Sequence, residues 1–242
     1  MTGAQLSALY DAGNQWAEDD DFFLAFVSER PNSRVLDLGC GTGRMTLAVA
    51  AAGHSVVGID PNPDSLAAAQ RKRGAEAVMW IDGTSAAIPQ EATFDVAIMT
   101  AHVAQAINDD DGWSRTLADV HRALVPGGML VFDSRDPAAR AWEHWTPAKT
   151  RRVHTLPDGS MVEAWIECAA ETGGLVALTE HRLCNGSTEE TETSVLAFRT
   201  EDQLRHDLNS AGFTVNHLYG GWAGEDVGSG QGELIVIAHK PA

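Results

Sequence analysis

Three glycines and two carboxylates near the start of the chain have types and spacing that suit a nucleotide-type binding site. Gly39, Gly41 and Gly43 follow the short apolar run of residues 35–38 and precede a helical pattern. Without a Cβ, their backbone can approach a ligand closely and adopt positive φ angles. A second apolar run ends at Asp60, about 20 residues further on, where an acid can meet ribose hydroxyls. We therefore expect a nucleoside-containing ligand at this turn.

The glycine spacing argues against a dinucleotide. The dinucleotide fingerprint is G-x-G-x-x-G, whose third glycine lets the helix pack on the strand. Here the pattern is G-x-G-x-G, and Arg44 stands where that third glycine belongs. Asp37, just before the glycines, would repel a diphosphate and suits a cationic ligand. Cys40 lies within the turn, where we interpret it as a small residue that fits and not as a nucleophile.

Apolar runs that alternate with helical patterns predict the strands that position this turn. The predicted strands of the first half are 35–38, 55–60, 77–82, 93–102 and 129–133. This order predicts a doubly wound α/β sheet, in which ligands bind at the carboxyl ends of the strands. His102 is the last residue of the fourth predicted strand, so it is a candidate acid or base at the crevice. A lone histidine can equally be a hydrogen-bonded structural residue.

The turn resembles the cofactor site of class I S-adenosylmethionine-dependent methyltransferases. The matching features are D-x-G-x-G-x-G at residues 37–43, the strand-end acid Asp60, and the leader L-x-P-G-G at residues 124–128. The resemblance covers nearly the whole chain, with residues 213–219 and 233–239 as the last two strands. It implies an enzyme with a Rossmann-like seven-stranded sheet, S-adenosyl-L-methionine as cofactor, and in-line methyl transfer.

The resemblance also implies roles for individual residues. The glycines would pass under the methionine and the ribose, and Asp60 would hold the ribose hydroxyls. Asp82 and Gly83 would hold the adenine, because a carboxylate accepts from the exocyclic amine and a glycine leaves room for the ring. The implied cofactor-binding residues are Tyr10, Asp37, Gly39, Cys40, Gly41, Gly43, Asp60, Pro61, Asp82, Gly83, Met99 and Thr100.

Tyr10 belongs to the helical pattern of residues 2–29. In this family an N-terminal helix often folds over the cofactor, with a tyrosine near the methionine end. Plain packing of Tyr10 against a neighbour is an equally open interpretation.

A second cluster follows the fifth strand. It contains Arg135, Arg140, Trp142, His144 and Trp145. Arginines can pair with a substrate carboxylate, and the same side chains can also form a packed aromatic junction. His102 and His144 are the candidate catalytic residues, since a hydroxyl acceptor needs a base, whereas an amine acceptor needs only to be neutral.

Strand patterns dominate residues 149–199. Hairpin signals join the predicted strands and indicate an antiparallel meander; these strands are 151–156, 160–169, 175–183 and 191–198, with turns at 158–159, 172–174 and 185–186. By resemblance this insertion is a lid over the substrate; a surface decoration or a dimer interface stays open. The predicted organisation is a methyltransferase core at 1–148, an antiparallel β lid at 149–199, and the rest of the core at 200–242.

Composition restricts the partners. The net charge of −17 opposes the phosphate neutralisation that nucleic-acid binding requires. We expect no signal peptide and no membrane span. Three cysteines without metal-ligand spacing predict a cytoplasmic protein without a metal site. The predicted acceptor is therefore a small molecule, methylated on oxygen or nitrogen, and the enzyme is a monomer or homodimer. Protein or tRNA methylation and a non-catalytic cofactor-binding module are the alternatives.

Overall fold

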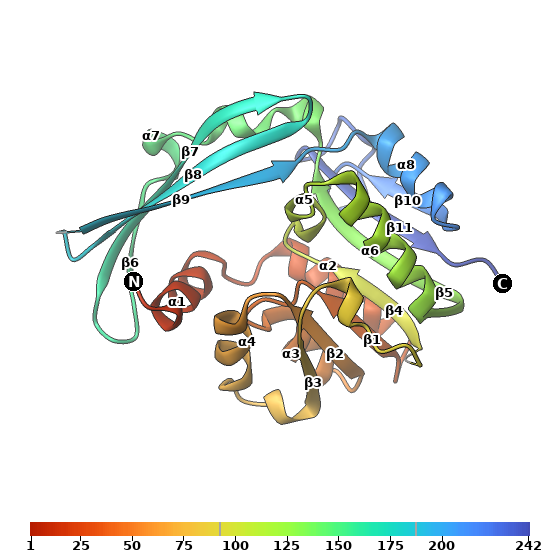
Figure 1. The fold of residues 1–242 in the computed structure, drawn as a ribbon. Helices are drawn as coiled ribbons and strands as arrows, with labels where there is room; N and C mark the ends of the chain where they lie inside the picture. Colours follow the sequence, from red (N-terminus) through yellow and green to blue (C-terminus); the bar gives the residue numbers. More distant parts are fainter. Residues whose placement is uncertain (92, 187) are drawn as a thin grey trace.

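The computed structural model describes residues 1–91, 93–186 and 188–242, which form two separate sheets (Figure 1). The order in the larger sheet is β10-β11-β5-β4-β1-β2-β3. Neighbours from β5 to β3 run parallel, and β11 is antiparallel to both β5 and β10. The strands are β1 (Arg34–Leu38), β2 (Ser55–Asp60), β3 (Val78–Asp82), β4 (Phe94–Met99), β5 (Leu124–Arg135), β10 (Thr214–Tyr219) and β11 (Glu233–His239). The predicted doubly wound, seven-stranded sheet is confirmed.

Helices cover both faces of this sheet. The helices are α1 (Gly3–Gly13), α2 (Glu18–Ser28), α3 (Arg44–Ala51), α4 (Pro63–Gln70), α5 (Val103–Ala106), α6 (Asp110–Ala123), α7 (Pro147–Thr150) and α8 (Glu201–Ser210). Four short 3-10 turns complete the described elements: η1 (Ala75–Ala77), η2 (Ser85–Ala87), η3 (Pro137–Ala139) and η4 (Ala141–His144).

Alternation along β1 shows how the core is divided. Leu36 and Leu38 lie in the core that includes Trp113 and Leu117 of α6, whereas Val35 lies in the core of α2 and α3. Successive residues of a strand point to opposite faces. Asp37 therefore shares the face of Val35, and it lies under the start of α3.

Strand β5 is longer than the predicted 129–133. Its residues 129–135 pair with β11, and Leu124 pairs with Phe94 of β4. The apolar pattern predicts only the fully buried part of β5. The preceding residues, Pro126 to Gly128, have the composition of a turn, so the pattern does not include them in the strand. Backbone bonds between Gly127, Gly128 and Lys240 extend the pairing with the chain after β11.

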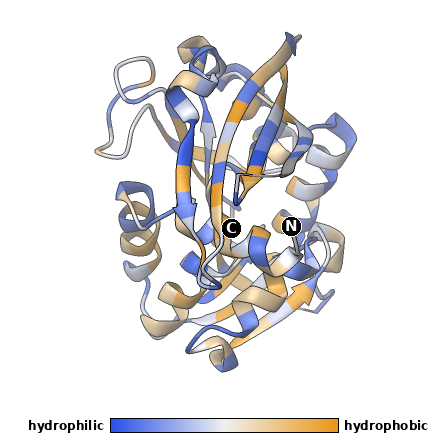
Figure 2. Cartoon of the chain, turned by 90° about the vertical axis from the view of Figure 1, so that its left-hand side faces the viewer, coloured by the Kyte–Doolittle hydropathy of each residue, from blue (hydrophilic) through white to orange (hydrophobic). Residues whose placement is uncertain are grey.

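The second sheet contains the insertion. Its order is β6-β7-β8-β9, all antiparallel, and it extends beside α1 (Figure 1). The strands are β6 (Arg152–Thr155), β7 (Met161–Thr172), β8 (Leu175–Cys184) and β9 (Thr188–Ala197). The predicted four-stranded meander is confirmed, with β7 and β9 each longer than expected. Hydrophilic and hydrophobic residues mix along these strands (Figure 2).

Candidate active site

The glycine turn joins β1 to α3 at the carboxyl end of the sheet. Gly39 and Gly43 have φ angles of 78° and 80°, in the left-handed region that glycine adopts without a steric penalty. A Cβ on Gly39 would lie 2.4 Å from the Val103 side chain. The amides of Gly39 and Cys40 both donate to the carbonyl of Ile59. These two bonds hold the turn against β2. Gly39 borders the two hollows described below, one on each side of the turn.

Asp60 holds the turn from the end of β2. Its Oδ2 accepts from the Gly41 amide at 2.7 Å, and its Oδ1 accepts from the Asn62 amide at 2.8 Å. Burial raises the pKa of the Asp60 carboxyl, and the two backbone bonds oppose that rise. Each carboxylate oxygen has a further lone pair, so Asp60 can still accept from a ligand hydroxyl.

A cleft of about 470 Å³ lies on one side of the turn. It brings together Gly39, Asp60, Pro61 and Gly83, four of the predicted cofactor residues. Apolar side chains such as Ile107 make up much of its remaining wall. Asp82 is exposed at the end of β3 and pairs in register with Asp60. This cleft has the size and the mixed lining of a small-molecule site.

A smaller pocket of about 60 Å³ lies on the other side of the turn. It brings together the predicted residues Tyr10, Gly39, Cys40 and Thr100. Met99 is fully buried in the core beside them, so it does not border the pocket. Burial raises the pKa of the Cys40 thiol, which leaves that thiol protonated and supports the interpretation of Cys40 as a small turn residue.

Asp37 lies beneath the turn and is buried. Its Oδ2 accepts from the Thr46 hydroxyl at 2.6 Å, and its Oδ1 has no hydrogen-bond partner among the described residues. Burial raises the pKa of this carboxyl to about 7. A buried carboxyl with an unsatisfied oxygen favours a cationic ligand over a diphosphate at this place. This orphaned oxygen and the Gly39 backbone fit the sulfonium cofactor that the sequence implied.

The N-terminal segment is fastened across the turn. Asp11 of α1 accepts from the Thr42 hydroxyl at 2.5 Å and pairs with Lys72 at 2.8 Å. Arg44 donates to the carbonyls of Asn14 and Gln15 at 2.7 and 2.8 Å. Arg44, which replaces the third fingerprint glycine, thus holds the segment that carries Tyr10.

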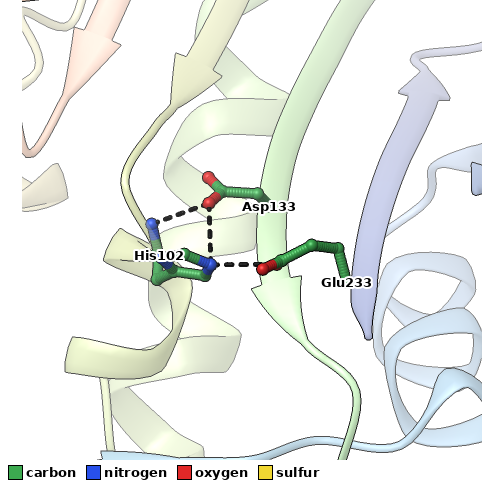
Figure 3. A group of neighbouring side chains, drawn as sticks. All are labelled: His102, Asp133 and Glu233. Atoms are coloured by element: carbon green, nitrogen blue, oxygen red, sulfur yellow. Dashed lines mark hydrogen bonds and ion pairs between the residues drawn. The ribbon is translucent and has the colours of Figure 1, made fainter. Parts of the chain in front are cut away.

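His102 lies in an unusual stretch of backbone. Ala101 and His102 have φ angles of 56° and 64°, a conformation that costs free energy for residues other than glycine. The His102 amide donates to Oδ2 of Asp133 at 3.0 Å, and its Nε2 lies 2.9 Å from Oε2 of Glu233 (Figure 3). Burial raises the pKa of the Asp133 carboxyl. Sequence reasoning missed Asp133 and Glu233, because nothing local in the sequence relates either residue to His102.

The hydrogen-bond partner of His144 is Lys149, which lies outside the glycine turn. It is exposed on η4, and its Nδ1 lies 2.7 Å from the Lys149 ammonium. Trp142 packs edge-on against Phe198 with ring centroids 4.7 Å apart. The cluster after β5 is therefore a packed aromatic junction at the start of the second sheet, and His144 borders none of the hollows described above.

A third hollow lies between α1 and the second sheet. This cleft of about 540 Å³ is bordered by Tyr10 and Asn14 from the N-terminal segment and by Trp165 and His181 from the sheet. The rings of Trp165 and His181 stack with centroids 4.9 Å apart. Tyr10 borders both this cleft and the small pocket at the turn. The two spaces therefore meet at one side chain.

Comparisons with known proteins agree with this geometry. Residues 35–128 match the family described as "Methyltransferase domain". Cypemycin N-terminal methyltransferase from Streptomyces sp. is 28% identical over 234 residues, which are 96% of this chain and 94% of that protein. Among the described residues, none of the helices combines the length and the apolar character that a bilayer crossing requires.

Solved structures agree in fold over almost the whole chain. An S-adenosylmethionine-dependent methyltransferase from Clostridium acetobutylicum ATCC 824 superposes with a TM-score of 0.77 at 16% identity and covers 98% of both chains. An amino pentose methyltransferase from Micromonospora echinaspora, solved with S-adenosylmethionine bound, gives a TM-score of 0.71 at 19% identity and covers 98% of this chain and 96% of its own. Together with the glycine turn and the sheet order, the match over residues 35–128 and the Streptomyces relative support a class I S-adenosylmethionine-dependent methyltransferase, and the solved structures show the same fold over almost the whole chain.

Proposed function

We propose that this enzyme methylates an amine nitrogen of a small-molecule acceptor that binds between α1 and the second sheet. The observation that carries the proposal is the position of Tyr10, which borders both the pocket at the glycine turn and the 540 Å³ cleft. In this proposal the acceptor in the cleft lies next to the methionine end of the cofactor, with Tyr10 between the two spaces. In this proposal residues 149–199 are the lid, and residues 1–148 and 200–242 form the core.

The residues at the turn fit the cofactor roles that the sequence implied. Asp60 has lone pairs to spare beside the larger cleft, where the ribose would lie, and Gly83 borders the space proposed for the adenine. Asp82 lies at the next strand end, beside Asp60. We propose the small pocket between Tyr10 and Thr100 for the methionine end. Bound S-adenosylmethionine would supply an activated sulfonium methyl group.

What the protein contributes is orientation and exclusion of water. Transfer requires nucleophile, methyl carbon and sulfur in line at roughly 3 Å approach. Tyr10 is held in place by the anchors of α1 and of Arg44. An amine acceptor needs only to be neutral and requires no base in the transfer step. The catalytic roles of His102 and His144 stay predictions. His102 is the better candidate for a base, because its imidazole contacts the Glu233 carboxylate, whereas that of His144 contacts the Lys149 ammonium.

The names of the related proteins support nitrogen as the acceptor atom. The Streptomyces relative is named an N-terminal methyltransferase, and the Micromonospora structure is described as an amino pentose methyltransferase. Both names point to acceptors that carry an amine. A net charge of −17 favours a cationic acceptor in solution and disfavours tRNA. We also propose a cytoplasmic monomer or homodimer.

The test is a transfer assay with methyl-labelled cofactor. The panel contains amino sugars, short peptides with free N-termini, their hydroxyl or N-acetyl counterparts, tRNA and folded protein. We expect label on amine acceptors and none on the N-acetyl counterparts. Transfer to tRNA or to folded protein alone would overturn the small-molecule proposal, and cofactor binding without transfer to any acceptor would favour a non-catalytic module.

A matched pair of variants tests the location of the acceptor. Trp165→Ala removes a ring from the wall of the cleft, whereas Trp16→Ala removes an exposed tryptophan ring that does not border this cleft. We expect Trp165→Ala to raise the acceptor KM severalfold without changing the affinity for adenosylhomocysteine. If Trp16→Ala has the same effect as Trp165→Ala, the acceptor does not bind in this cleft.

A further inference from the structure

Three side chains with metal-binding atoms converge beside the loop that follows β4. His102 comes from that loop, Asp133 from β5, and Glu233 from the first position of β11 (Figure 3). The antiparallel pairing of β5 with β11 places Glu233 opposite Arg135, two residues beyond Asp133. Residues that are far apart in the sequence are thus brought to one point by the sheet.

The distances between the donor atoms suit a metal ion. Nε2 of His102 lies 2.9 Å from Oε2 of Glu233 and 3.3 Å from Oδ2 of Asp133. All three donor atoms lie within 4.8 Å of one another. Nitrogen and oxygen ligands lie about 2.0–2.2 Å from a bound transition metal, so adjacent ligands are about 3 Å apart. Rotation of the partly exposed Glu233 side chain can adjust the third distance.

The charges leave room for a cation. Asp133 is fully buried, and its Oδ1 has no hydrogen-bond partner among the described residues. The adjacent cation is Arg135, which donates to Gln105 at 2.9 Å and lies over the Trp145 ring. Arg135 offsets one of the two carboxylates at most. A divalent ion would balance the remaining negative charge.

A backbone hydrogen bond to Asp133 holds the loop that carries His102 in place. The left-handed conformation of Ala101 and His102 is held by the bond from the His102 amide to Asp133. The same carboxylate oxygen therefore fixes the backbone of His102 and faces its imidazole. Strained backbone of this kind persists where the surrounding structure over-determines it.

We propose that His102, Asp133 and Glu233 bind one divalent transition-metal ion. One imidazole and two carboxylates form a mixed nitrogen and oxygen donor set, which suits Mn²⁺ and Zn²⁺ better than the all-oxygen preference of Ca²⁺. The side chains of His102 and Glu233 are 20% and 15% exposed, so water completes the coordination. This site could not be predicted from the sequence, because the expectation of no metal site rested on cysteine spacing alone.

The ion would lie next to the methionine-end pocket. Thr100, Ala101 and Val103 border that pocket, and His102 lies between them in the chain. The metal therefore stabilises the loop that forms the pocket wall. The site goes beyond the proposed function, because its occupancy does not depend on which acceptor is methylated.

The experiment is a titration of chelator-treated full-length protein with Mn²⁺, followed by electron paramagnetic resonance of the free ion, and with Zn²⁺, followed by calorimetry. We expect about one equivalent of metal for each chain. Glu233→Gln keeps the size of the side chain and removes its charge; we expect the affinity to fall by about tenfold or more, as happens when a metal site loses a supporting group.

The matched control is Glu167→Gln on the second sheet. Glu167 lies 3.3 Å from the Nε2 atom of His181, so this variant also removes a carboxylate beside an imidazole, but far along the chain from the cluster. Metal affinity should stay unchanged. Circular dichroism of each variant confirms that loss of binding is not loss of folding.

Two results would overturn the proposal. One is the absence of stoichiometric binding in the wild-type protein. The other is equal binding by wild type and Glu233→Gln, which would place the ion elsewhere. If metal does not bind and His102→Ala slows methyl transfer, His102 contributes to methyl transfer without being a metal ligand.

Discussion

At the scale of single residues, buried carboxyls determine which ligand the turn accepts. Asp37 and Asp60 lie on neighbouring strands, and burial raises the pKa of both. A diphosphate at this turn would be repelled by both carboxylates when they are ionised. A sulfonium compound with its own ammonium group offers the positive charge that this environment lacks, which explains how the same fold type can avoid pyrophosphate ligands.

Asp60→Ala should weaken cofactor binding. The variant loses the acceptor for the Gly41 and Asn62 amides together with the proposed ribose contact. We expect a loss of about 1–3 kcal/mol of binding free energy, measured by calorimetry with adenosylhomocysteine. The control is Asp95→Ala, since Asp95 pairs with Arg34 at the opposite end of the sheet. Unchanged affinity in Asp60→Ala would remove Asp60 from the cofactor site.

Asp37 should make the stability of the cofactor-free protein depend on pH. Its folded-state pKa of about 7 lies above the ordinary value of 3.8. The folded state therefore binds the proton more tightly, so this contribution is complete below about pH 4 and is lost as the pH rises through 7. The full loss is about 4 kcal/mol at most.

The comparison of wild type with Asp37→Asn isolates this contribution. Denaturant unfolding between pH 4 and pH 8 should give a wild-type stability that falls relative to the variant. A constant difference across that range would show that Asp37 titrates as an ordinary carboxyl.

At the scale of elements, local sequence signals determine the helices, strands and turns, whereas long-range pairing determines which side chains meet. Turns such as Asn185-Gly186 and the capping box of Thr200 with Gln203 are encoded by adjacent residues, and so the elements could be predicted. The convergence of His102 with Glu233 depends on the register between β5 and β11. A single sequence does not specify such a register, and the cluster could not be predicted for that reason. The position of Tyr10 over the turn depends in the same way on side-chain anchors between distant segments.

The anchoring of α1 gives a prediction at this scale. Asp11→Ala removes the bonds to Thr42 and Lys72, while the helix keeps its own N-terminal capping box. Loss of about 1 kcal/mol of tertiary contact should raise local opening roughly fivefold. Hydrogen exchange should then accelerate over residues 3–13 and not over α6, whose buried residues lie in the main core. Equal exchange in both proteins would show that α1 is held by packing alone.

At the scale of the whole molecule, the charge and the position of the second sheet act together. The chain carries 34 acidic and 17 basic residues, and the sheet forms one wall of the cleft that ends at Tyr10. A negative field of this kind draws cationic ligands toward a cleft and raises their association rate. Under the proposed function, the arrangement favours acceptors that arrive as ammonium ions and release a proton to solvent before transfer.

Salt should therefore slow the reaction of a cationic acceptor selectively. Between about 20 and 500 mM NaCl the screening length falls from about 20 Å to under 5 Å. We expect kcat/KM for an amine acceptor from the labelled panel to fall severalfold over this range, with kcat nearly constant, because association and not transfer is affected. The dissociation constant of adenosylhomocysteine, measured in the same buffers, controls for general effects of salt on the cofactor site. A value of kcat/KM that is independent of salt would mean that the negative charge of the molecule plays no part in acceptor capture.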